Sequence, residues 1–149
     1  MKIKLTQQKE QNEIEVEIKY CEMNNMVNHL VKRLENYCYH ICGNDNGRIY
    51  KIDVDDIFYI ESVDRKTFIY STKQVFRTEK KLYQILEELK SHDFVQINKS
   101  VIVNINVLES MEMLANSRIQ VTLQNGEKLN ATRTYIPNIK KAFNKEENN

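Results

Sequence analysis

The second half of the chain alternates short β-branched apolar runs with polar, basic turns, a pattern typical of strands joined by hairpins. The turn at 98–100 reads Asn-Lys-Ser and precedes the apolar run at 101–103, whereas the turn at 132–134 reads Thr-Arg-Thr and follows a strand-like segment. Polar connections between strands lie on the surface, where their backbone groups find partners. We therefore expect Lys99 and Arg133 to be displayed to solvent.

Two motifs around these turns resemble the LytTR family, the all-β DNA-binding domain of many bacterial transcription regulators. From Phe94 the chain reads F-V-Q-I-N-K-S-V-I-V-N, close to the family pattern F-x-R-x-H-R-S-x-x-V-N, and from Asn125 it reads N-G-E-K-L-N-A-T-R-T-Y, close to N-G-x-x-x-x-V-S-R-x-Y. The chain departs from the family with Asn-Lys for His-Arg at 98–99 and Ala-Thr for Val-Ser at 131–132. Lys keeps the charge of Arg but lacks its planar fork, so phosphate contact is the expected role of Lys99.

The resemblance runs from Asp56 to Phe143 and implies a mainly β fold, a stack of small, mostly antiparallel β-sheets with a few short helices. We expect a LytTR-like DNA-binding domain at 46–144, a short α/β extension at 1–45 and a frayed tail at 145–149. In the family, loops enter the major groove of double-stranded DNA. The corresponding residues of this chain are Arg65, Lys66, Asn98, Lys99, Ser100, Arg133 and Thr134.

Two patterns predict the secondary structure of the extension. Apolar side chains at Ile14, Val16, Ile18 and Tyr20 alternate with charged ones, which favours a half-buried strand. Apolar residues then recur at helical spacing over 22–36, which predicts an amphipathic helix. This unit has no counterpart in the LytTR motif, so we interpret it as a dimerisation element, with completion of the core as the alternative.

Further elements follow from local sequence. Strands at 37–42 and 48–52 are expected to form a hairpin around the Gly- and Asn-rich turn at 43–47. Pro137 suits the first turn of a terminal helix, and we expect Tyr135 to anchor that helix to the core. Additional strands are expected at 57–63, 67–71 and 74–77, a basic turn at 64–66, and a helix over 82–89.

Charge is distributed unevenly along the 149 residues, although the formal net charge is only +1. Residues 1–63 carry 8 basic and 11 acidic side chains, whereas residues 64–149 carry 14 basic and 10 acidic ones. Basic charge is thus concentrated where the displayed turns lie, as a local nucleic-acid-binding patch requires.

The cysteines favour a reducing, cytoplasmic environment, since Cys21, Cys38 and Cys42 follow no signal peptide. We interpret Cys38 and Cys42 as buried thiols, because a zinc site would need two more suitably spaced ligands. No metal or other cofactor is expected. The chain also lacks a run of about 18 apolar residues, which a membrane-spanning helix would need.

The sequence is also compatible with two functions other than DNA binding. An RNA-binding module would use the basic loops together with aromatic strand residues such as Phe68 and Tyr70. A protein-interaction domain without nucleic acid is the reading that the near-neutral net charge favours. A gel-shift titration against duplex DNA and single-stranded RNA separates these functions.

We do not expect an enzyme or a small-molecule substrate. The acidic residues Asp53, Asp55, Asp56 and Glu61 would suit a divalent metal in a nuclease, but strand alternation separates their faces. No nucleophile elbow, phosphate-binding glycine loop or zinc signature is present.

The resemblance also bears on regulation. Many relatives place a phosphorylatable receiver domain before this module, and the ~45 residues available here are too few for its five-stranded fold. We therefore expect control by abundance, by homodimerisation or by a partner protein. Freestanding family members are often encoded with a small membrane protein, so the resemblance implies a membrane-protein regulator.

Overall fold

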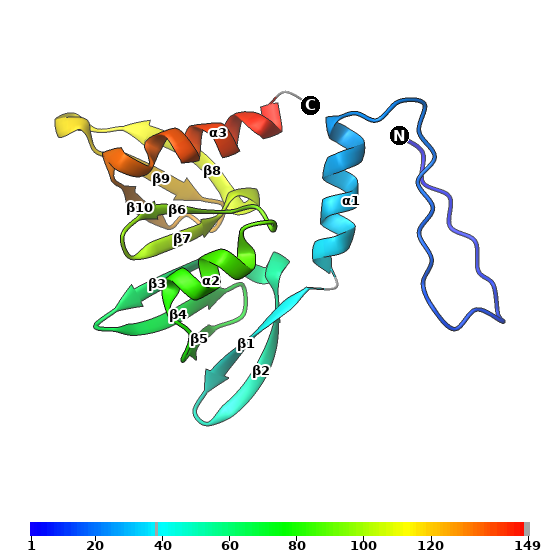
Figure 1. Cartoon of the computed structure of the whole chain (residues 1–149), viewed down its shortest axis with the longest axis horizontal. Coiled ribbons are helices and arrows are strands. Elements are labelled where there is room, and N and C mark those ends of the chain that lie inside the picture. The colour runs from blue at the N-terminus through cyan, green and yellow to red at the C-terminus, as the bar shows by residue number, and fades with distance from the viewer. Residues whose placement is uncertain (38, 148–149) are drawn as a thin grey trace.

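The computed structural model describes residues 1–37 and 39–147, which form ten strands and three α-helices (Figure 1). The helices are α1 (Asn25–Tyr37), α2 (Leu82–Leu89) and α3 (Ile136–Glu147). The strands are β1 (His40–Asp45), β2 (Arg48–Asp53), β3 (Ile57–Val63), β4 (Lys66–Ser71), β5 (Val75–Thr78), β6 (Phe94–Asn98), β7 (Val101–Asn104), β8 (Leu108–Met113), β9 (Ile119–Leu123) and β10 (Lys128–Ala131). The mainly β fold class predicted from the sequence is confirmed.

All strand pairs are antiparallel and form two sheets, one of seven strands in the order β2-β1-β5-β4-β3-β7-β6 and one of three in the order β10-β9-β8. The first hairpin turns at Asn46 and Gly47, whose φ angles are 51° and 85°. A two-residue hairpin turn needs positive φ, which Asn and Gly tolerate. The predicted hairpin is confirmed, but its first strand begins at His40 because Tyr37 still belongs to α1.

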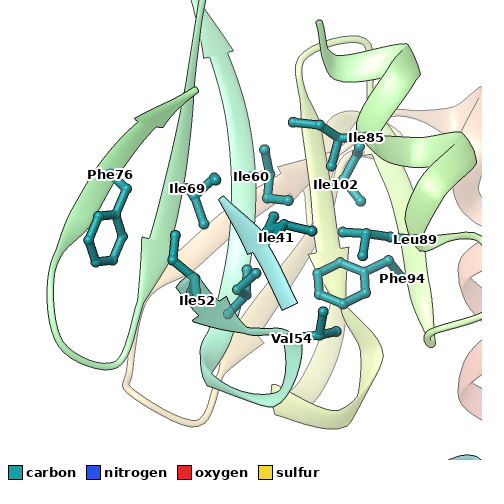
Figure 2. Close-up of a cluster of buried hydrophobic side chains, with 11 residues drawn as sticks. Ile41, Ile52, Val54, Ile60, Ile69, Phe76, Ile85, Leu89, Phe94 and Ile102 are labelled. Carbon is teal, nitrogen blue, oxygen red and sulfur yellow. The ribbon is translucent and has the colours of Figure 1, made fainter. Parts of the chain in front are cut away.

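Two hydrophobic clusters lie on opposite faces of the seven-stranded sheet. Alternation along β7 separates them, since Ile102 belongs to the first cluster and its neighbours Val101 and Val103 to the second. In the first cluster, Ile85 and Leu89 of α2 pack over the sheet (Figure 2). The second cluster lies between this sheet, the three-stranded sheet and α3. Both faces of the central strands are therefore buried, which holds the strand ends in fixed positions.

Helix α1 stands beside the sheets and buries only part of its surface (Figure 1). The side-chain oxygen of Asn24 accepts a hydrogen bond of 3.0 Å from Val27 N, which caps the first turn. Asn36 is buried, and its side-chain Oδ1 shares a hydrogen bond with the ring nitrogen Nδ1 of His92. The ring of Tyr39 stacks on the ring of His92. The predicted helix over 22–36 is confirmed with a later start.

The strand predicted from Ile14 to Tyr20 is wrong for the single chain, because residues 14–20 belong to neither sheet. Ile14 is 93% exposed and Val16 is 56% exposed. A period-two pattern marks a strand only where a neighbouring strand supplies hydrogen bonds and an apolar surface. In Figure 1 this segment runs on the far side of α1 from the sheets, and no strand of the described residues pairs with it.

One smaller prediction needs correction, and another stays a prediction. Helix α3 continues to Glu147, and fraying of the tail at 145–149 stays a prediction. Cys42 was expected to be buried, yet its side chain is exposed because Ile41 and Gly43 take the inward positions of β1. Cys38 and residues 148–149 lie outside the described residues.

Candidate nucleic-acid interface

Three polar segments, 64–66, 98–100 and 132–134, lie next to one another at one end of the sheets, and we call them together the turn face. Ser62 N, two residues before the first segment, donates a hydrogen bond of 2.8 Å to Ser100 O in the second. Thr132 N in the third segment donates one of 2.9 Å to Ile97 O, one residue before the second. In Figure 1 the corresponding turns and the start of α3 all project to the left. The sequence predicted each turn, and the structure brings all three together.

The β3–β4 turn presents its basic residues in a fixed geometry. Asp64 and Arg65 have φ angles of 50° and 65°, and Val63 pairs with Lys66 across the hairpin. Positive φ at two successive residues defines a two-residue hairpin turn, here without glycine. Arg65 and Lys66 are both exposed, as expected from the sequence.

The β6–β7 turn is held by the side chain of Asn98. Its Oδ1 accepts a hydrogen bond of 2.8 Å from Ser100 N, and its Nδ2 donates one of 2.8 Å to Asn130 O. Asn98 therefore uses both ends of its amide to fix the backbone, the local role that small polar turn residues often have. Lys99 is exposed at the tip, whereas Ser100 is half-buried.

The third segment leads into the N-terminus of α3. Arg133 begins a 3₁₀ turn that ends at Tyr135, and the side chains of Arg133 and Thr134 are exposed. Tyr135 packs against the second hydrophobic cluster, which confirms its predicted role as an anchor. The helix dipole places partial positive charge at Ile136, the first residue of α3, three residues after Arg133 in the sequence. This combination favours an anion.

A fourth turn at the same end escaped the sequence analysis. Ile119 pairs with both Ala131 and Met113, so the β8–β9 turn lies beside the start of the third segment (Figure 1). Leu114 N donates a hydrogen bond of 2.7 Å to the carbonyl of Arg118, whose side chain is exposed. The available signal was one basic residue immediately before the alternating strand at 119–123, which is weak by itself.

The charges of the turn face favour a polyanion. Asp64 is its one acidic residue, against the exposed basic residues Arg65, Lys66, Lys99 and Arg133. Exposed basic groups gathered on one face supply the attraction to phosphate that nucleic-acid binding needs.

Aromatic residues of β3 and β4 support the hairpin and do not form an open stacking surface. Tyr70 stacks on Tyr59 with ring centroids 4.2 Å apart and donates a hydrogen bond of 3.3 Å to Glu61 Oε2. Burial, followed by interaction with Glu127, raises the pKa of Tyr59. Phe68 is also partly buried. Single-strand binding needs exposed aromatic rings, so this arrangement gives the RNA-binding alternative little support.

The acidic residues considered for metal binding do not converge. Asp55 and Asp56 lie in a 3₁₀ turn, whereas Glu61 accepts the hydrogen bond from Tyr70. Burial raises the pKa of Asp55, an effect that Arg33 of α1 opposes. Within residues 1–37 and 39–147, no three His, Cys, Asp or Glu side chains form a group that could hold a metal ion. No helix in this part of the chain is long and apolar enough to cross a membrane.

Comparison with known proteins links this geometry to a family. The sequence profile of the LytTr DNA-binding domain matches residues 47–144. The sensory transduction protein LytT of Enterococcus faecalis is 28% identical over 93 residues, which is 62% of this chain and 38% of that protein. The sensory transduction protein LytR of Staphylococcus haemolyticus is 31% identical over 95 residues, 64% of this chain and 37% of that protein. The match thus spans well under half the length of these relatives.

Two further matches concern overall length and fold. An uncharacterized HTH-type transcriptional regulator of Staphylococcus aureus is 24% identical over 142 residues, which is 94% of this chain and 96% of that protein. Among solved structures, a LytTr DNA-binding domain from Bacillus cereus matches with a TM-score of 0.65 and 18% identity, covering 69% of this chain and 94% of that structure. This likeness establishes the fold of the sheet region.

Proposed function

Because the chain belongs to the LytTR family of DNA-binding domains, we propose that it is a sequence-specific transcription regulator whose turn face enters the major groove of DNA. The observation that supports this proposal is that hydrogen bonds at or within two residues of the three basic turns hold them at one end of the sheets. The two hairpin turns lie two strand spacings apart, about 10 Å. That separation suits a major groove about 12 Å wide.

The residues of the turn face divide by chemistry. Arg133 is proposed to read guanine, since a guanidinium can bond O6 and N7 together. Lys99, Arg65 and Lys66 supply positive charge to phosphates, with smaller contributions from the hydroxyl groups of Ser100 and Thr134. Asn98 positions the second turn through its two backbone hydrogen bonds. Arg118 extends the basic surface toward the flanking phosphates.

A binding titration tests this function. The full chain is mixed with duplex DNA from its own promoter, with a scrambled duplex and with single-stranded RNA, each at two salt concentrations. We expect tight binding to the promoter duplex that weakens as salt rises, because phosphate contacts release counterions. Equal affinity for the scrambled duplex would contradict sequence-specific recognition, and a preference for RNA would support the RNA-binding alternative.

We also propose that the protein binds DNA as a homodimer in the bacterial cytoplasm. The apolar side chains of Met26, Leu34 and Tyr37 on α1 are 55%, 40% and 76% exposed, and a partner would cover them. Two linked modules bind two half-sites more tightly than one because the second contact is intramolecular. The same exposed helix would also be available to a membrane-protein regulator, as the family resemblance implies.

A further inference from the structure

Residues 14–20 carry a strand pattern that the single chain leaves unused. Ile14, Val16 and Tyr20 are 93%, 56% and 51% exposed, although they alternate regularly with Glu15 and Glu17. Apolar side chains in such alternation are stabilised when the segment pairs with a strand and one face is covered. The segment therefore has the composition of a strand whose neighbour is supplied from elsewhere.

Strand β2 is an open edge of the seven-stranded sheet. It pairs with β1 on one side, and no backbone hydrogen bond of the described residues joins its outer side to another segment. The opposite edge, β6, is covered by α3 and by the hydrogen bond from Thr132 N to Ile97 O. An edge strand presents unpaired backbone donors and acceptors, to which another strand can add.

We propose that residues 14–20 of one copy add as a strand to β2 of a second copy, and that the second copy returns the same contact. The inference rests on the dimer proposed above and adds a strand-exchange contact to the covering of α1. A reciprocal exchange of this kind closes with two-fold symmetry and leaves neither segment unpaired.

Charge complementarity favours the edge of β2 over the edge of the smaller sheet, and it favours a parallel over an antiparallel alignment of the added strand. With Val16 beside Tyr50, a parallel strand places Glu17 beside Lys51 and Lys19 beside Asp53. Opposite charges on directly neighbouring strand positions are stabilising, and like charges are destabilising. An antiparallel strand that kept Glu17 beside Lys51 would place Glu15 beside Asp53, so two carboxylates would meet.

The alignment also matches the faces of the sheet. Tyr50 and Ile52 point toward the first hydrophobic cluster, so Val16 and Ile18 would extend that apolar face. The charged side chains of the added strand would then lie on the solvent side with Lys51. Strand β8, the free edge of the smaller sheet, is a poorer site because it carries Glu109 and Glu112, which repel the acidic segment.

The placement of the segment favours a second copy over the same chain. In Figure 1 it hangs on the side of α1 that faces away from the sheets, so reaching its own β2 would require it to turn back past the helix. The turn face lies at the opposite end of the molecule in the same view and stays free for DNA.

Two charge-exchange variants of the full chain test the proposal by sedimentation equilibrium. The segment variant carries Glu17→Lys and Lys19→Glu, and the edge variant carries Lys51→Glu and Asp53→Lys, so both keep the net charge. Each is expected to weaken its own dimer about tenfold or more, since like charges meet at both junctions. An equimolar mixture should recover the parent dimer, because both junctions of the mixed dimer are complementary.

Two further variants make the result decisive. Val16→Pro with Ile18→Pro removes backbone donors from the added strand and should abolish the dimer. Glu109→Lys with Lys128→Glu is a charge-neutral exchange on the smaller sheet and should leave the dimer unchanged. Melting curves like that of the parent show that each variant is folded. The proposal would be overturned by a monomeric parent, by charge-exchange or proline variants that dimerise like the parent, or by a mixture that dimerises no better than its components.

Half-site DNA affinity is measured separately on the same variants and is expected to stay unchanged. A failure of DNA binding is therefore distinguishable from a failure of strand exchange.

Discussion

The two ends of this protein differ in how completely the chain organises itself. At the turn face, backbone and amide hydrogen bonds at or within two residues of the basic turns hold them together over a fully buried core. At the other end, residues 1–24 form no regular secondary structure and α1 buries little of its apolar surface. The turn face is therefore preorganised for a ligand, whereas the N-terminal region has the apolar surface of an unfinished interface.

This contrast shows how a short domain can separate two tasks. Preorganised contact residues bind without a large loss of conformational entropy, which favours tight and specific recognition. A segment that becomes ordered on association pays that entropy when the partner arrives, which makes assembly sensitive to concentration. In the proposed dimer, the abundance of the protein would then regulate DNA binding through dimerisation.

The largest expected effect comes from the core beneath the turn face. Ile97 is completely buried, so Ile97→Ala is expected to lower the free energy of unfolding by about 2 to 5 kcal/mol. At protein concentrations where the chain is monomeric, Ile14→Ala changes a side chain that is 93% exposed, and its free energy of unfolding should lie within about 0.5 kcal/mol of the parent. Urea denaturation of both variants measures the difference. A similar cost at the two sites would remove the contrast between the two regions.

Arg133→Ala tests the preorganised surface itself. We expect a loss of about 1 to 3 kcal/mol in affinity for the specific duplex, the usual worth of a bidentate contact to a base, with unchanged melting. Arg48→Ala, measured with Arg133→Ala on a half-site duplex to which the proposed strand exchange at β2 does not contribute, is the matched control, because Arg48 is an exposed arginine away from the turn face. Fluorescence anisotropy with labelled duplex gives both affinities. Equal losses in the two variants would assign Arg133 to general charge attraction.

The sequence predicted the turn face well because its signals are local. Polar residues between β-branched runs marked the turns, and Lys99 and Arg133 are exposed as expected. The contact between these turns could not be derived from local pattern, since it depends on the bond of Asn98 to Asn130, 32 residues away. Arg118 was missed for the same reason, because only the pairing of β8, β9 and β10 brings its turn to this end.

The N-terminal region was predicted less well. Alternation predicts which side chains of 14–20 would share one face of a strand, but it carries no information about whether a neighbouring strand exists. The helix prediction held because α1 is stabilised by its own backbone hydrogen bonds and by the Asn24 cap. A strand needs a neighbouring strand for its backbone hydrogen bonds, whereas a helix forms these bonds within itself. This explains why the helix prediction over 22–36 succeeded and the strand prediction over 14–20 failed.

Lys99→Ala is expected to have a smaller and less selective effect. Removing one phosphate contact should weaken binding to all duplexes and reduce the slope of log affinity against log salt by about one unit. Affinities measured across a series of salt concentrations give this slope. Loss of discrimination at one base position with an unchanged slope would instead assign base reading to Lys99.

The smallest expected effect concerns the junction between the two regions. Burial opposes ionisation of Glu88, but hydrogen bonds from Lys80 and Tyr39 outweigh it and lower the pKa of this carboxyl. Its stabilisation is therefore present above the unfolded pKa of about 4.3 and is lost as pH falls through the lower folded value. Glu88→Gln should make the free energy of unfolding less sensitive to pH between the unfolded pKa and the lower folded pKa of this carboxyl. Denaturation at several acidic pH values measures this, and an unaltered pH dependence would show that Glu88 contributes nothing to it.

The most direct test of the preorganised surface is an NMR titration of the full chain with the promoter duplex, followed through backbone amide shifts. The account predicts the largest shift changes at 64–66, 98–100 and 132–134, with residues 14–20 changing only as far as the duplex promotes the proposed strand exchange. Strong shifts confined to residues 1–24 or α1, with the three turns unchanged, would contradict the assignment of the turn face as the DNA-binding site.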